Sequence, residues 1–302
     1  MLKLKYLKYP NLILVKLLTK NIISISDEIF IRLIFKLKLN RNIDLSNPKS
    51  LNEKCQWIKL YDRNPLYSDL VDKYEVKKIV KKKIGEKYII PTIGIYDTFD
   101  EINFDKLPNQ FVIKCTHDSG GLIVCTDKNK LNLKKARSKI SKSLRKNYYY
   151  DWREWPYKDV KPRIIIEKYM GENLLDFKIQ CFNGEVDNIL VCAERASLSG
   201  VKYYYFDKNW RFLNYSINTT EEESKKITKP DNLDQMLDIA KKLAQNLPEV
   251  RVDLYNIENH IYFGEMTFFS EAGFDTTITT AADYEMGKHF ILPKKKEDEY
   301  EN

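Results

Sequence analysis

The sequence predicts an α+β fold, with a helical N-terminal region at residues 1–90, two strand-rich lobes at residues 91–170 and 171–293, and a mobile tail at residues 294–302. Helical periodicity dominates the chain before Pro91, and a strand, a glycine loop and a second strand follow it. A series of short antiparallel strands then crosses the second half. With 302 residues, 43% of them hydrophobic, the chain can bury a large core.

Helix signals recur through the N-terminal region. Ser50 or Asn52 can cap a helix over residues 53–60, and a second periodic run covers residues 66–83. An amphipathic helix is expected within residues 22–39, after the cap-like Ser26-Asp27-Glu28. We interpret it as packed on the body of the protein, and peripheral docking on an anionic membrane is the alternative.

The later segments alternate between strands and helices. Two basic or amphipathic helices are expected, at residues 131–146 and 233–247. The expected strands cover residues 111–114, 122–126, 163–169, 177–182, 186–194, 250–256 and 260–266. Asn183-Gly184 is a strong hairpin turn, and Glu258-Asn259 joins the last two strands. The middle of the chain therefore reads as a β-meander.

Composition excludes several classes of protein. The formal net charge is +8, but basic and acidic residues alternate without a compact basic stripe, so we expect no nucleic-acid binding. The five cysteines form no CxxC pair, which argues against a zinc site or disulfide framework and favours a reducing compartment, the cytoplasm. Charged residues interrupt every apolar run before the ~18 residues of a spanning helix. No small-residue cleavage site follows the short N-terminal apolar run.

The most informative residues are two carboxylates on the last hairpin. Asp253 and Glu265 lie on strands joined by a short turn and can face each other. Such a pair can hold Mg²⁺, which retains substrate phosphates as its remaining ligands. Arg251, two residues from Asp253, points to the same face and can stabilise charge on a phosphoryl group. Two solvent-facing acids on an exposed sheet are the alternative.

Two further segments fit a nucleotide site. Lys114 ends a strand before the turn Ser119-Gly120-Gly121, where a lysine and backbone N–H groups can approach phosphates. Residues 164–170 form an apolar strand that runs into a charged hinge, where Glu167 can orient the edge of an adenine ring. A plain hairpin turn and an ordinary buried strand are the respective alternatives.

In this order the segments resemble the ATP-grasp superfamily, most closely its TupA-like branch, which is associated with teichuronopeptide and surface-polysaccharide biosynthesis. The resemblance runs from about Asp44 to Pro293. It is carried by residues 47–54, 57, 60–62, 71–76, 111–121, 166–169, 176–178, 251–255 and 264–267. It implies two α+β lobes that clamp ATP, with Mg²⁺ as the metal.

The resemblance also implies roles for individual residues. The implied nucleotide-binding residues are Lys73 and Lys114 at the phosphates, Ser119, Gly120 and Gly121 in the loop over them, Glu167, Tyr169 and Met170 at the adenine, Asp176 at the ribose, and Lys178. The implied metal ligands are Asp253, Glu265 and Thr267, with Arg251 as the catalytic residue at the transferring group. Many ATP-grasp ligases have Asn where this chain has Thr267. Threonine keeps an oxygen ligand but weakens the case for a second tightly held ion.

The implied activity is an ATP-dependent carboxylate–amine ligase that works through an acylphosphate, with an acidic sugar or polysaccharide precursor and an amine or amino acid as substrates. A cytoplasmic enzyme of capsule or other surface-polysaccharide biosynthesis is expected, with the inner face of the membrane as the alternative location. A glycosyltransferase is the main rival function, although the chain has no Asp-x-Asp motif. A non-catalytic scaffold is the third possibility.

Two segments are candidate contact surfaces for an anionic sugar. The basic helix at residues 131–146 offers lysines, and the aromatic stretch at residues 148–157 offers ring faces. A solvated face and a packed linker explain them equally well. Of the three histidines, His117 lies close enough to the loop to touch phosphates, and structural roles are expected for His260 and His289.

Overall fold

The structure is a computed structural model that describes residues 10–172, 174–193 and 200–295. The described α-helices are α2 Pro10–Thr19, α3 Asp27–Leu39, α4 Leu51–Tyr61, α5 Leu66–Val71, α6 Glu75–Ile84, α7 Leu133–Leu144, α8 Tyr149–Trp152, α9 Glu221–Ser224, α10 Leu233–Ala244 and α11 Thr280–His289. The strands are β1 Thr92–Tyr96, β2 Phe111–Cys115, β3 Leu122–Cys125, β4 Ile164–Lys168, β5 Asp176–Phe182, β6 Glu185–Ala193, β7 Lys202–Phe206, β8 Phe212–Leu213, β9 Glu249–Ile257 and β10 His260–Thr267. The predicted α+β class is confirmed.

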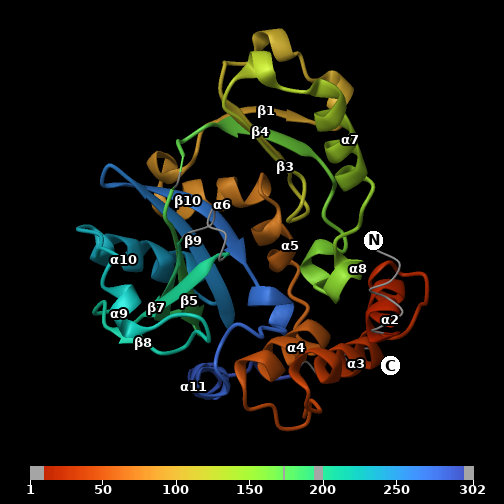
Figure 1. The fold of residues 1–302 in the computed structure, drawn as a ribbon, viewed down its shortest axis with the longest axis vertical. Coiled ribbons are helices and arrows are strands. Elements are labelled where there is room, and N and C mark those ends of the chain that lie inside the picture. The colour runs from red at the N-terminus through yellow and green to blue at the C-terminus, as the bar shows by residue number, and fades with distance from the viewer. Residues whose placement is uncertain (1–9, 173, 194–199, 296–302) are drawn as a thin grey trace.

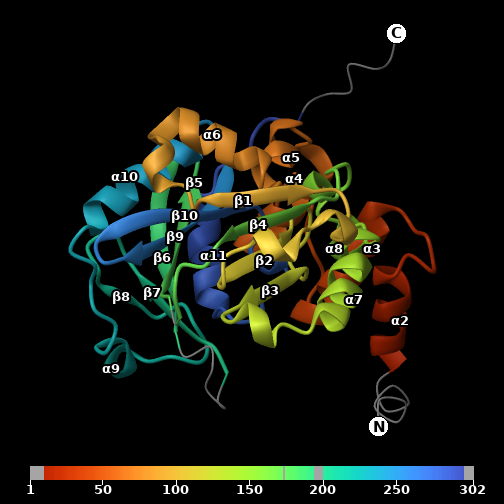
Figure 2. The same ribbon diagram turned by 90° about the horizontal axis from the view of Figure 1, so that it is seen from above.

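The smaller lobe is a four-stranded antiparallel sheet in the order β1-β4-β2-β3 (Figure 2). Helix α7 packs against β2 and closes one face. Its Ala136 and Ile140 share a buried cluster with Ile113 and Ile166 of the sheet. The apolar strand at residues 164–168 is thus the centre of this lobe, with neighbours on both sides.

The larger lobe is a six-stranded antiparallel sheet in the order β10-β9-β5-β6-β7-β8 (Figure 1). Helix α10 crosses β9, β5 and β6, and buries Met236, Ile239 and Leu243 against them. The predicted helix at residues 233–247 is therefore confirmed and ends three residues early. The turn Asn183-Gly184 also holds: both residues have positive φ, 52° and 80°, as a tight hairpin requires.

The N-terminal helices pack beside these sheets. Helix α3 begins after Ser26, whose hydroxyl accepts a hydrogen bond from the N–H of Ile29. Its apolar residues Phe30 and Phe35 are fully buried in a cluster with Phe274 from the far end of the chain. The packed interpretation of this helix is confirmed for its apolar face. Membrane docking stays a prediction, and no helix in the described ranges combines the length and apolarity needed to span a bilayer.

Helix α4 shows which of the two cap candidates is used. The Ser50 hydroxyl accepts from the Glu53 N–H, and the Glu53 carboxylate accepts from the Ser50 N–H at 3.1 Å, forming a capping box. Asn52 instead lies inside the helix and ties it to the C-terminal region, because its side chain donates to the carbonyl of Asp275 at 3.2 Å.

The periodic run at residues 66–83 is not one helix, and the expectation of a continuous helix was wrong. It divides into α5 and α6 around Asp72, whose carboxylate accepts from the N–H groups of Tyr74 at 2.8 Å and Glu75 at 3.2 Å. A side chain that binds nearby backbone N–H groups competes with helical hydrogen bonds and starts a new helix. Because of this break Lys73 lies outside both helices, and its backbone N–H donates to the carbonyl of Thr116 at 3.1 Å.

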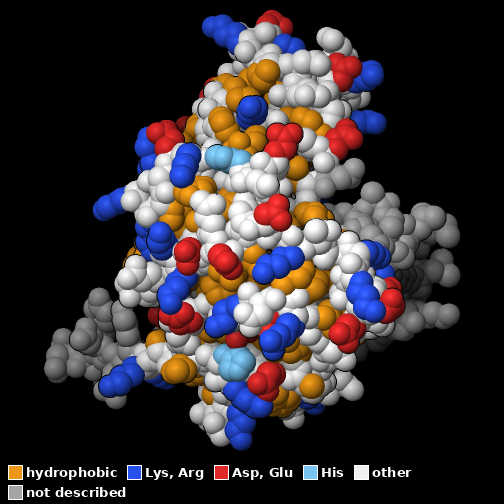
Figure 3. Space-filling model, turned by 90° about the vertical axis from the view of Figure 1, so that its left-hand side faces the viewer, with side chains coloured by type: hydrophobic (Ala, Val, Ile, Leu, Met, Phe, Trp, Pro, Cys, Tyr) orange, Lys and Arg blue, Asp and Glu red, His pale blue; other side chains and the backbone are white. Residues whose placement is uncertain are grey.

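Three strands were not predicted. β1 is a short edge strand with a central glycine, which weakens its strand signal. β7 contains three consecutive tyrosines instead of alternating polar and apolar residues, and β8 has only two residues. The predicted strand at residues 186–194 is β6, which ends at Ala193, and its last predicted residue lies outside the described ranges. Most of the predicted tail, residues 296–302, also lies outside them. On the face in Figure 3, basic and acidic side chains are interspersed around apolar ones.

Candidate functional site

Three adjoining pockets lie where the two sheets face each other. We name them the hinge pocket, which follows β4, the central pocket between the lobes, and the aromatic pocket beside α8. Lys114 and Leu122 line both of the first two, and Lys73, Ser119 and Glu265 line both of the last two. Shared walls make the three pockets one continuous cleft.

The hinge pocket has a volume of about 450 Å³ and mostly apolar walls. Val112 and Val124 line one side, and the predicted hinge residues Tyr169 and Met170 line the other. Both the size and the apolar character suit a planar ring such as adenine. Glu172 lines this pocket too and escaped prediction, although it follows the hinge directly in sequence.

Glu167 closes the inner end of the hinge pocket and is almost fully buried. Lys114 pairs with it at 2.7 Å, and Lys77 of α6 pairs with its other oxygen. Burial opposes ionisation of Glu167, but the two lysine charges outweigh burial and lower the pKa of its carboxyl. Lys77 was not predicted, because no local pattern shows that α6 brings it to β4.

The central pocket, of about 250 Å³, gathers the predicted phosphate and metal residues from both lobes. Its charged residues are Lys73, Lys114 and Lys178 with Asp118, Asp176, Asp253 and Glu265, next to Ser119 and Gly121. The three lysines could contact a phosphate chain, and the four carboxylates could contact a cation bound with it.

The loop between β2 and β3 is fixed by side chains from three directions. The Lys73 ammonium donates to the carbonyl of Asp118 at 2.5 Å, and the Asp118 carboxylate accepts from the Gly121 N–H at 3.0 Å. Ser143 of α7 binds the second oxygen of that carboxylate. These contacts hold Ser119 and Gly121 against the central pocket.

Position 121 needs a glycine because a side chain would not fit there, and its backbone φ is one that other residues can adopt. A Cβ atom there would lie 2.6 Å from both the Cys115 Sγ and the Ser143 Oγ, whereas one at Gly120 would meet nothing closer than 4.0 Å. We therefore expect Gly121→Ala to lower the free energy of unfolding by about 1–3 kcal/mol, the usual cost of overpacking. Gly120→Ala is the matched control and should be nearly neutral in urea unfolding. Equal effects of the two substitutions would contradict this assignment.

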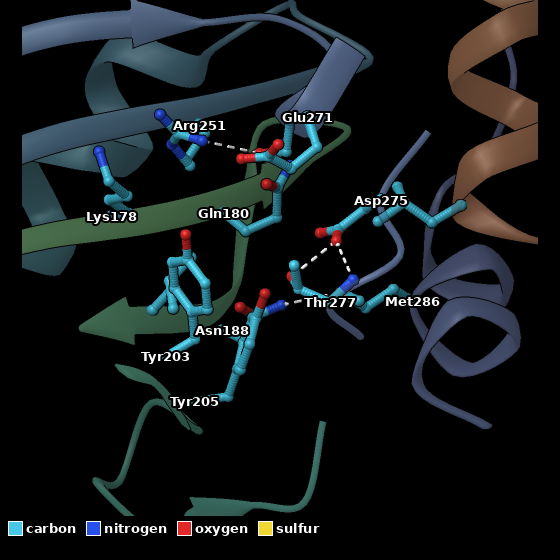
Figure 4. A pocket seen from close by; sticks show the side chains of 13 residues that line it. Lys178, Gln180, Asn188, Tyr203, Tyr205, Arg251, Glu271, Asp275, Thr277 and Met286 are labelled. Atoms are coloured by element: carbon cyan, nitrogen blue, oxygen red, sulfur yellow. Dashed lines mark hydrogen bonds between the residues drawn. The ribbon is translucent and has the colours of Figure 1, made fainter. Parts of the chain in front are cut away.

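On the last hairpin, Arg251 and Asp253 form a bidentate pair. Nε donates to Oδ1 at 2.6 Å and Nη2 to Oδ2 at 2.9 Å, and Lys178 from β5 also pairs with Oδ2. Burial opposes ionisation of Asp253, but Arg251 and Lys178 together lower the pKa of its carboxyl. Figure 4 shows Arg251 and Lys178 beside a small cavity of about 30 Å³, with Arg251 bonded to Ser270.

Glu265 and Thr267 complete this cluster. Glu265 lies opposite Asp253, and Thr267 lies opposite Arg251, because a register shift between Phe263 and Glu265 displaces the strand by one residue. The Thr267 hydroxyl is 3.3 Å from the Glu265 carboxylate and accepts from Arg251 at 3.1 Å. The four predicted residues of the last hairpin therefore lie next to one another in the structure.

The donor set suits Mg²⁺ held jointly with phosphates. No three acidic, histidine or cysteine side chains converge into a closed metal cage anywhere in the described ranges. Mg²⁺ is instead commonly held by one or two carboxylates plus substrate phosphates. Asp253 and Glu265 would supply the carboxylates and Thr267 a hydroxyl, all on the hairpin beside the lysine-lined pocket.

The structure places Asp176 in the central pocket and His117 in the interior. Asp176 pairs with Lys178 at 2.8 Å in the central pocket and does not line the hinge pocket, so its contact with ribose stays a prediction. His117 is buried and its Nε2 faces the carbonyls of Ser143 at 3.2 Å and Lys146 at 3.1 Å. It binds the end of α7 rather than lining a pocket, so the suggested phosphate contact was wrong.

The aromatic pocket, of about 330 Å³, lies beyond the metal-ligand cluster. Tyr148, Trp152 and Tyr157 from the predicted aromatic segment line it together with Arg251 and Glu265. This segment therefore borders the site rather than serving only as a linker. Its contact with a sugar stays a prediction, as does that of α7.

Two antiparallel α+β lobes that meet along a lysine-lined cleft have the arrangement of the ATP-grasp fold. The model of the TupA-like ATP-grasp family matches residues 53–291, so the chain belongs to this family. No curated protein matches the chain.

Among solved structures, the chain is similar to D-alanine–D-alanine ligase from Bacillus anthracis complexed with ATP, with 15% identity, a TM-score of 0.41, and 78% of this chain covered. It spans 62% of that ligase's length. D-alanine–D-alanine ligase from Helicobacter pylori gives 14% identity, a TM-score of 0.42, and 78% and 66% coverage of the two chains. The ATP-grasp ligase PsnB, complexed with a minimal precursor, Mg and ADP, is 12% identical with a TM-score of 0.37. The match covers 72% of this chain and 57% of PsnB.

Proposed function

We propose that this protein is an ATP-dependent carboxylate–amine ligase. The observation that carries the proposal is the continuous cleft, in which Lys114 joins an apolar hinge pocket to a lysine-lined central pocket and Glu265 joins the central pocket to the aromatic pocket. Adenine and the phosphates would occupy the hinge and central pockets, and the reacting carboxylate would lie next to the γ-phosphate, where Glu265 joins the central and aromatic pockets. ATP with a carboxylate next to its γ-phosphate is long enough to reach along this row of pockets.

Each side chain has a task in such a reaction. Lys73 and Lys114 would bind the phosphates, and Arg251 would stabilise the charge that develops on the transferring phosphoryl group. Bound Mg²⁺ would neutralise phosphate charge, held by Asp253, Glu265 and Thr267. The carboxylate oxygen bonds to the γ-phosphorus as ADP leaves. The amine nitrogen then bonds to the acyl carbon of the acylphosphate, the C–O bond to phosphate breaks, and the nitrogen loses a proton as phosphate departs. The enzyme itself needs no nucleophile.

The substrates we propose are a uronic acid of a surface polysaccharide or its precursor, and an amine or amino acid. Support comes from the resemblance to the teichuronopeptide-associated branch and from the net charge of +8, which raises encounter rates with acidic polymers. We propose a cytoplasmic site of action, where ATP is available, with attachment at the inner membrane face as the alternative.

Nucleotide preference tests the proposal without knowledge of the substrates. Mg-ADP should raise the melting temperature by several degrees, because a ligand at 100 times its Kd adds about 2.7 kcal/mol to the stability of the native state. UDP-glucose at the same concentration should produce little change. An equal or larger shift with UDP-glucose would favour the glycosyltransferase reading instead.

A further inference from the structure

The aromatic pocket contains a buried carboxylate that the proposed reaction does not yet use. Glu154, between α8 and the next helical turn, is 5% exposed and lines this pocket. No hydrogen bond or ion pair joins its carboxylate to another described residue, and its oxygens are not sealed in the interior, so the group is open to the pocket. Burial raises the pKa of Glu154 to about 7, although the nearby Lys59 charge opposes this.

Lys59 does not serve as the missing partner. Its ammonium donates to the carbonyl of Trp152 at 3.0 Å and to that of Ala272 at 2.5 Å, and lies farther than 4 Å from Glu154. Another lysine of the pocket, Lys38, lies 4.0 Å from the centre of the Trp152 ring. Lys59 is therefore a neighbouring charge and not a bonded partner, so the Glu154 carboxylate can still pair with a cation that enters the pocket.

The walls around Glu154 favour an organic cation. Tyr148, Trp152 and Tyr157 line the same pocket, and aromatic faces attract ammonium groups. Arg251 and Glu265 also line it, so a ligand bound here lies beside the metal ligands and the residue at the transferring group. A hydrated metal ion prefers oxygen ligands, and these aromatic walls supply few of them.

We propose that Glu154 binds the ammonium group of the amine co-substrate, which makes the aromatic pocket the acceptor site of the ligase. The inference rests on the proposed function for the reaction that this amine enters. The recognised group is a primary ammonium, which an amino acid or an amino sugar can supply. Glu154 would then determine specificity for amines over alcohols and neutral nucleophiles.

The test is calorimetric titration of amines into the full-length protein with Mg-ADP bound. The probes are the common L-amino acids and glucosamine, each compared with its N-acetyl derivative, which lacks the ammonium. Wild type should bind at least one amine and not its N-acetyl form. Glu154→Gln should weaken that binding by about tenfold or more, as for loss of a hydrogen bond to a charged group. Comparing the amino acids with glucosamine shows which of the two classes of amine the pocket binds.

Asp151→Asn is the matched control, because Asp151 lies on the same segment, pairs with Lys146 and lines none of the three pockets. It should bind the amine as wild type does. Glu154→Gln should keep its Mg-ADP shift, since position 154 lies outside the nucleotide pockets, and a modest fall in its melting temperature is expected because the buried Lys59 loses a neighbouring negative charge. Unchanged amine binding in Glu154→Gln, equal binding of the N-acetyl forms, or no amine binding to wild type would overturn the inference. A missing Mg-ADP shift would instead overturn the proposed function.

Discussion

Replacing Glu265 by glutamine is expected to reduce Mg-ATP turnover by about 100-fold or more, as when a group that stabilises developing charge at a reaction centre is removed. Glu265 lies at the junction of the central and aromatic pockets, and its side chain is 43% exposed to the cleft. Glutamine keeps the volume and one oxygen but lacks the charge that holds Mg²⁺. Release of ADP in the presence of candidate uronic acids and amines measures the effect.

The same substitution should leave the fold intact. Glu265 accepts only weak contacts in the ligand-free protein, at 3.3 Å from Thr267 and 3.8 Å from Arg251, so the free energy of unfolding should change by less than about 0.5 kcal/mol. Glu258→Gln, at the exposed turn of the same hairpin, is the control and should retain full turnover. Turnover by Glu265→Gln at the level of this control would show that the hairpin acids are ordinary surface residues.

Lys114→Met should weaken Mg-ADP and Mg-ATP binding by at least about tenfold, as expected for loss of a hydrogen bond to a charged group. Lys114 lines both the hinge and central pockets and pairs with the buried Glu167 at 2.7 Å. Its removal takes a positive charge from the phosphate region and leaves Glu167 with Lys77 alone. Titration calorimetry well below the melting temperature measures the affinity.

Lys77→Met separates the loss of a phosphate-binding charge from the loss of a partner of Glu167. Lys77 also pairs with Glu167 but lines neither pocket, and its ammonium is further held by the Ile90 carbonyl at 2.8 Å and Thr92 Oγ1 at 2.9 Å. Both variants should lose stability, because each removes a partner of a buried carboxylate. Only Lys114→Met should lose most of its nucleotide affinity. Equal losses of affinity would assign Lys114 to positioning Glu167 instead of binding phosphate.

The sequence predicted those parts of the site that depend on short-range pattern. Arg251 and Asp253 share one face of a strand because side chains alternate, and a short turn brings Glu265 opposite them. Ser50 was one of two cap candidates because it directly precedes the expected helix, and the structure adds that Glu53 completes its capping box. Local rules of this kind operate within a few residues and can be read from one chain.

Other features depend on contacts between distant segments, which no local pattern reveals. The run at residues 66–83 has unbroken helical periodicity, yet Asp72 interrupts it and also pairs with Arg163, 91 residues away, at 2.8 Å. Glu154 lies in a strongly aromatic segment, where nothing local marks one acid among the rings, and it becomes buried where this segment packs against α4 and the turn at Ala272. Its significance appears only with the pocket around it.

The most direct test of the ligase assignment follows an oxygen atom. Uronic acids labelled with ¹⁸O in the carboxylate are incubated with the protein, Mg-ATP and the amines above, and the released phosphate is analysed by mass spectrometry. Transfer of the γ-phosphoryl group to the carboxylate predicts one ¹⁸O atom in the phosphate for each amide formed, together with one ADP. Amide formation with unlabelled phosphate, or sugar transfer from a nucleotide sugar without consumption of ATP, would contradict it.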